Sequence, residues 1–215
     1  MSDASFENVF EETFLNKVRS MTPEDAMNVL KQKIVENWYR ENAAWPEGDI
    51  MPWDKANEAI ELLEQSPEPE TLAKLGAAFS EGLTSRTIAQ LWDKLNEDQR
   101  KRVLRSIKRG IALHGLEEFF DALLNTLHPK VSLKGEGGDA LAKQILKKAY
   151  EFIDGKISFD ELMNSIAGLL AQYYPDIDTS KLSKPFTEAK TLSYYVNNSD
   201  LKRLVSKLFS LTSSL

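Results

Sequence analysis

Apolar side chains recur along this chain at intervals of three and four residues, in segments separated by turn-forming residues. Residues 158–173 are typical, because Leu162, Met163 and Ile166 fall on one face of a helix. The sequence has no strict apolar–polar alternation bounded by hairpin turns, which is the pattern of a half-buried strand. The pattern therefore predicts an all-α protein, an irregular bundle of roughly ten helices. The expected helices span about residues 5–20, 22–41, 53–64, 69–80, 84–95, 98–110, 111–127, 139–153, 158–173, 185–196 and 199–211.

Residues that favour helix ends mark the boundaries of these segments. Ser, Thr, Asn and Asp favour the N-cap, and a Glu or Gln three residues later completes a capping box. Gly and Pro favour positions just beyond a helix, so Gly110 is expected to end one helix and His128-Pro129 the next. The predicted N-terminal caps are Thr22, Thr84, Asn96 with Gln99, Asp139, and Ser158 with Glu161.

Glycines concentrate in one short segment, where Gly135, Gly137 and Gly138 lie close together. Ordering such a segment costs more conformational entropy, so residues 131–138 are expected to form a linker. The predicted organisation is a helical domain over residues 1–130, this linker, and a C-terminal helical subdomain over residues 139–215.

The expected helix over residues 98–110 sorts its charges onto one side. Five cations share one face, Val103, Leu104 and Ile107 share another, and residues 99–110 contain no acid. Because the apolar positions must face the core, the cations are expected to point outward. We refer to this face as the basic stripe, and it consists of Lys101, Arg102, Arg105, Lys108 and Arg109.

The charge distribution sets the basic stripe apart from the rest of the chain. The formal net charge is −6, and residues 1–99 carry 9 basic and 20 acidic side chains, whereas residues 100–130 carry 7 and 3. A rigid row of Lys and Arg side chains suits phosphate groups or an acidic protein. One alternative is a solvated face that pairs with the protein's own acidic first half. Another is a nucleic-acid contact within a loose helix-turn-helix over residues 84–110.

A tryptophan-rich loop is the second candidate contact. Trp45 lies within residues 42–52, and Trp53 follows directly. Because this segment is too apolar for a free loop, it is expected either to fold back over the core or to present Trp45 and Trp53 to a protein partner.

Catalytic and cofactor motifs are sparse. The chain has no cysteine, which excludes disulfides, thiolate nucleophiles and Cys-ligated metal sites. The spacing of His114, Glu117 and Glu118 could hold a metal, but with two histidines in the chain no metal site is expected. The turn from Asp154 to Glu161 offers too few carboxylates for calcium. No cofactor is therefore predicted.

These observations favour a non-enzymatic interaction protein, such as an adaptor, a regulator or an assembly subunit, that contacts an anionic or protein partner through the basic stripe. The alternatives are a nucleic-acid-binding subunit that uses the same helix and an enzyme with a dispersed carboxylate or serine site. The sequence lacks a long apolar run and a secretory signal, so a soluble cytoplasmic protein with no membrane contact is expected.

Overall fold

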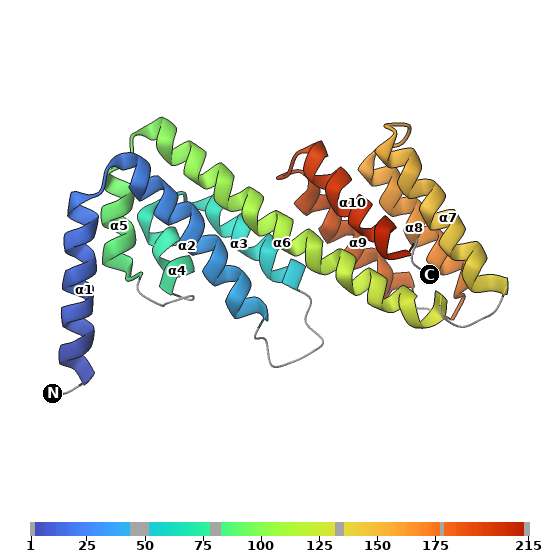
Figure 1. Ribbon diagram of the computed structural model, residues 1–215, viewed down its shortest axis with the longest axis horizontal. Coiled ribbons are helices and arrows are strands. Elements are labelled where there is room, and N and C mark those ends of the chain that lie inside the picture. The colour runs from blue at the N-terminus through green and yellow to red at the C-terminus, as the bar shows by residue number, and fades with distance from the viewer. Residues whose placement is uncertain (1–2, 44–51, 78–82, 132–135, 177–178, 213–215) are drawn as a thin grey trace. The chain divides into compact units, whose positions relative to one another are not determined.

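The computed structural model describes the backbone of residues 3–43, 52–77, 83–131, 136–176 and 179–212. It describes the side chains of residue 9 and of residues 11–35, 55–75, 83–123, 140–176 and 182–207. Over these residues the fold is all-α, with ten helices and no strand, which confirms the predicted fold class (Figure 1). The helices are α1 (Asp3–Ser20), α2 (Pro23–Ala43), α3 (Pro52–Gln65), α4 (Pro69–Ala77), α5 (Ser85–Asp93), α6 (Glu97–Val131), α7 (Glu136–Ile153), α8 (Phe159–Tyr173), α9 (Thr179–Ser193) and α10 (Asn198–Thr212).

Reciprocal hydrogen bonds cap several of these helices, as the sequence predicts. At α6 the backbone N–H of Gln99 donates to Asn96 Oδ1 over 2.9 Å, and the N–H of Asn96 donates to Gln99 Oε1 over 3.0 Å. Ser158 and Glu161 form the expected capping box at α8, with N···O distances of 3.1 and 2.6 Å. Each pair satisfies backbone donors that have no partner inside the helix.

Single threonines cap two further helices as predicted. Thr22 Oγ1 accepts a hydrogen bond from the backbone N–H of Asp25 over 3.2 Å, and Thr84 Oγ1 accepts one from Thr87 over the same distance. Both threonines thus fix where a helix begins.

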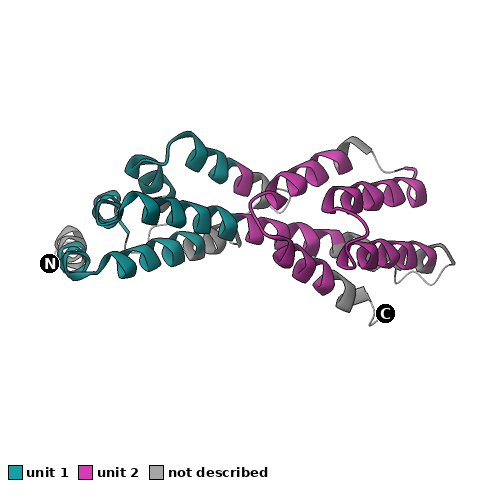
Figure 2. Ribbon diagram, turned by 90° about the horizontal axis from the view of Figure 1, so that it is seen from above, with its two compact units in different colours: residues 1–50, 58–111 teal, residues 51–57, 112–215 magenta. Residues whose placement is uncertain are grey.

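The chain divides into two compact units, shown in different colours in Figure 2. Unit 1 comprises residues 1–50 and 58–111, and unit 2 comprises residues 51–57 and 112–215. The boundary falls between Ile111 and Ala112, inside α6. Of the linker predicted over residues 131–138, residues 132–135 lie outside the described part of the chain, so the linker stays a prediction.

Unit 1 is built around α4 and α5, which pack against each other, with α1 and α2 packed against α5. Its core consists of aliphatic side chains that are removed from water, each of which contributes about 1.5–3 kcal/mol on burial. The largest of them are Leu15, Leu30, Ile34, Ile60, Leu63, Leu72, Ile88, Leu91, Ile107 and Ile111.

Unit 2 packs α7 against both α8 and α10, and α8 against α9. Aromatic side chains form one part of its core: Phe119 meets Phe120 and Phe186 edge to face at centroid distances of 5.4 and 5.2 Å. Phe159 lies 6.4 Å from Phe120 and 5.9 Å from Phe152 in the same geometry. These edge-to-face pairs tie α6, α7, α8 and α9 together.

The predicted helix end at Gly110 is wrong, because α6 continues through it as one helix of 35 residues to Val131. A Cβ atom at Gly110 would lie 2.8 Å from Cγ2 of Val35 and 3.1 Å from its Cγ1. Glycine therefore serves the close approach of α2 and α6 here, not a turn. The predicted end at His128-Pro129 is wrong for the same helix, which extends beyond both residues.

Two predicted helix starts are also wrong. α7 begins at Glu136, so Asp139 lies inside the helix instead of capping it. α9 begins at Thr179, so Pro185 lies inside it, where proline lacks the N–H that would bond to the preceding turn. In both cases the helix extends upstream of the residue that the sequence marked as its start.

Candidate functional site

The first half of α6 positions the basic stripe by burying the opposite face. Val103 and Ile107 are 0% exposed, and Leu104 is half-buried. The cap formed by Asn96 and Gln99 fixes the start of the helix. Buried anchors and a fixed start together hold the basic stripe on a rigid element.

The side chains of the basic stripe lie mostly on the surface, as expected. Lys101, Arg102, Arg105 and Arg109 are exposed, whereas Lys108 is half-buried. The five side chains of the stripe therefore differ in their exposure to solvent.

Lys101 and Lys108 have carboxylate partners. Lys108 Nζ lies 3.7 Å from Glu64 Oε1 of α3, and its side chain is 22% exposed. Lys101 Nζ lies 3.0 Å from Glu97 Oε1, one turn earlier in α6. This hydrogen bond raises the pKa of Lys101 and lowers the pKa of Glu97. Lys101 and Lys108 thus pair with the acidic first half of the chain, as one of the alternatives for the stripe expects.

Arg102 and Arg105 form the open part of the stripe. Both are exposed, they lie three residues apart on α6, and no described side chain forms an ion pair with either. Arg109 lies one turn further on and is also exposed, but it already interacts with another group, so the open part consists of Arg102 and Arg105 alone. Guanidinium groups bind carboxylate and phosphate through paired N–H donors, so this part of the stripe suits an anion.

Arg100 has a structural role that the sequence reasoning missed. Its Nε donates a hydrogen bond to the backbone oxygen of Trp92 over 3.2 Å, and its guanidinium carbon lies 5.4 Å from the centre of that ring. Trp92 is 4% exposed, so it belongs to the core of unit 1 and offers no platform for base stacking beside the stripe. Arg100 stabilises the junction of α5 and α6.

The tryptophan-rich loop lies largely outside the described residues. Trp45 falls within residues 44–51, and Trp53 lies in α3 but outside the described side chains. The expected contact through Trp45 and Trp53 therefore stays a prediction.

His114, Glu117 and Glu118, the residues whose spacing could hold a metal, lie in unit 2. His114 Nδ1 lies 4.0 Å from Glu117 Oε2, and burial lowers the pKa of His114. Burial raises the pKa of Glu118, and Asp121 and Glu117 raise it further. Among the side chains that the structure describes, no group of three or more such residues has the arrangement of a metal site.

The turn between α7 and α8 uses its polar groups for helix capping. Gly155, at φ 76°, donates its N–H to Phe152, and Lys156 donates to Glu151, as in a Schellman motif. The carboxylate of Glu161 accepts a hydrogen bond from the backbone of Ser158, which lowers the pKa of Glu161. Helix capping therefore accounts for the glycine and acid that suggested a cation loop.

Comparison with protein-family models, with curated proteins and with solved structures finds no match to this chain. Among the described helices, none is both long enough and apolar enough to cross a membrane. The class that the fold and the site define is an all-α protein with a basic helix face.

Proposed function

We propose that this protein is a non-enzymatic interaction protein, an adaptor, regulator or assembly subunit, that contacts an anionic partner through Arg102 and Arg105. The observation that carries the proposal is a pair of exposed guanidinium groups on a capped helix whose opposite face is buried, and neither group forms an ion pair with a described side chain. A rigid helix loses little conformational entropy when such groups bind, so more of the electrostatic attraction appears as affinity.

An acidic protein surface is the preferred partner, and nucleic acid is the alternative. The acidic first half of the chain argues against coating of nucleic acid by the whole surface. The burial of Trp92 removes the aromatic residue that is nearest to the stripe in the sequence and on which a base could stack. Carboxylates on a protein partner, in contrast, can bind to the guanidinium groups without any aromatic residue nearby.

The test compares two charge reversals of equal size in the full-length protein. The first variant is Arg102→Glu with Arg105→Glu, and the control is Lys17→Glu with Arg86→Glu, two exposed cations on α1 and α5. The probes are fluorescent poly-glutamate and a labelled DNA duplex, with affinity measured at several salt concentrations.

The expected result is a loss of poly-glutamate affinity of about tenfold or more for the α6 variant but not for the control. Stronger binding of the duplex would favour the nucleic-acid alternative, and its salt slope should then fall by about two when both arginines are reversed. Equal losses in both variants would overturn the proposal, because only net charge would then matter. The helical circular dichroism spectrum checks that both variants fold.

A further inference from the structure

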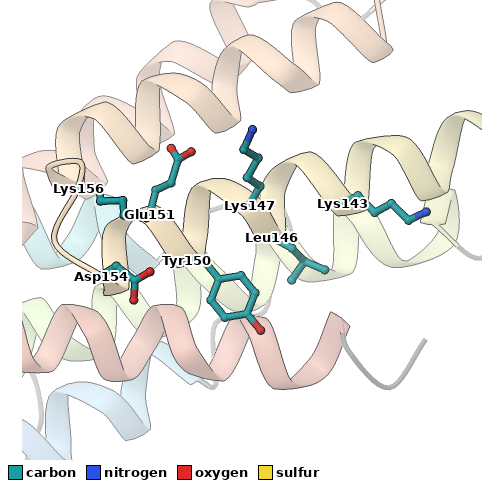
Figure 3. Close-up of a pocket in the computed structure, with 7 residues that line it drawn as sticks. All are labelled: Lys143, Leu146, Lys147, Tyr150, Glu151, Asp154 and Lys156. Carbon is teal, nitrogen blue, oxygen red and sulfur yellow. The ribbon is translucent and has the colours of Figure 1, made fainter.

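A second surface lies in unit 2, on the outer side of α7. A shallow cavity of about 420 Å³ follows this helix. Figure 3 shows Leu146 and Tyr150 on one side of α7 and Lys147 and Glu151 on the other. We propose that this groove, here termed the α7 groove, binds an acidic amphipathic segment of a partner protein.

The floor of the α7 groove is apolar. Leu146 is half-buried, and Tyr150, one turn further along, is 50% exposed. A half-exposed tyrosine presents a large rigid ring at little entropic cost, which is why this residue is enriched at binding hot spots. An apolar side chain of the partner would remove the ring of Tyr150 and the side chain of Leu146 from water.

The rim of the α7 groove carries a positive charge. Lys143 and Lys147 lie one turn apart, Lys156 lies at the far end, and no described side chain forms an ion pair with any of them. The carboxylate of Glu151 lies 3.0 Å from Lys148 Nζ, so its charge is largely compensated. Among the described residues that line the groove, three cations and one carboxylate, that of Asp154, have no ion pair.

This combination favours an acidic peptide over a nucleic acid. Two carboxylates one turn apart on a partner helix have the same spacing as Lys143 and Lys147. An apolar side chain between them would reach the floor, as in other complexes where a helix occupies a groove. A phosphate chain would instead meet the carboxylate of Asp154 and could not use Leu146.

The test uses the full-length protein and a displayed library of random 12-residue peptides. The expected selection is a family of peptides with two acids one turn apart and an apolar residue between them. Synthetic copies of the selected peptides then bind the wild type, Tyr150→Ala, and Lys143→Glu with Lys147→Glu. Tyr194→Ala is the matched control, because Tyr194 is 75% exposed at the end of α9 and does not line the groove.

We expect both groove variants to lose about tenfold or more in affinity and Tyr194→Ala to lose none. The lysine reversal tests the proposal even if Tyr150→Ala alters folding, because both lysines are exposed. Three results would overturn the proposal: no enrichment of acidic peptides, equal binding by the groove variants, or tighter binding of a single-stranded oligonucleotide than of any selected peptide. The variant with Arg102→Glu and Arg105→Glu is measured alongside. If it alone loses affinity for the selected peptides, the proposal is overturned and the proposed function is supported instead.

Discussion

Replacement of Gly110 by alanine tests whether α6 is continuous because α2 needs a close approach to it. The new Cβ would lie 2.8 and 3.1 Å from the two methyl carbons of Val35. Since both methyls of this β-branched side chain are close, rotation about χ1 does not clear the contact. The backbones of α2 and α6 must therefore move apart.

Two opposing terms set the size of the effect. Alanine is more favourable than glycine inside a helix by about 1 kcal/mol. Overpacking of a fitted contact costs about 1–3 kcal/mol, so we expect a net loss of up to about 2 kcal/mol in the free energy of unfolding. The matched control is Gly168→Ala in α8, where a Cβ would meet nothing within 4 Å. That variant should gain up to about 1 kcal/mol, because only the helix propensity acts.

The assay is urea unfolding followed by helical circular dichroism, with the two variants and wild type measured side by side. Adding Val35→Ala to Gly110→Ala should relieve the contact, so the double variant should be more stable than the sum of the single effects predicts. If Gly110→Ala stabilises the protein as much as Gly168→Ala does, α2 does not approach α6 closely and the reasoning fails.

Three further predictions concern single side chains. Lys94→Met should lower the free energy of unfolding by about 1–2 kcal/mol, because Lys94 Nζ donates to the backbone oxygens of Arg19 and Met21 over 3.1 Å each at the end of α1. An unchanged urea midpoint would contradict this. Gly155→Ala should cost about 1–2 kcal/mol, since Gly155 has φ 76°, and a melting temperature equal to wild type would refute it. Burial lowers the pKa of His114 below its ordinary value of 6.5. At pH values just below 6.5 the unfolded chain therefore binds more protons than the folded protein does. Stability should therefore fall as pH drops below about 6.5, and His114→Gln should reduce that slope.

Local signals in the sequence correctly predicted the all-α fold and most of the N-terminal caps, but not the continuity of α6 or the starts of α7 and α9. A capping pair joins residues three positions apart, so the pattern at Ser158 and Glu161 contains both partners of the bond. The same signal at Asn197 and Asp200 was missed, although the backbone N–H of Asp200 donates to Asn197 Oδ1 over 2.8 Å. Asparagine favours the N-cap, so Asn197 could have been predicted from the sequence, although Asp200 stands where the capping-box rule expects Glu or Gln.

Gly110 shows why other features could not be predicted in this way. A glycine after an apolar run satisfies the rule for a helix end, and the rule uses neighbours in sequence. What decides its role is Val35, which lies in a different helix. Only the packing of α2 against α6 distinguishes a glycine that ends a helix from one that lets two helices meet.

In the basic stripe, too, the spacing of residues predicted some features, and others depend on contacts between helices. The spacing of Val103 and Ile107 correctly predicted which face of α6 is buried. It could not reveal that Glu64 of α3 lies beside Lys108, because that ion pair joins separate helices. Cations that look equivalent in the sequence therefore differ in whether their charge is already paired within the protein. This is why the binding test reverses Arg102 and Arg105: a reversal of Lys108 would break a contact within unit 1 and confuse stability with affinity.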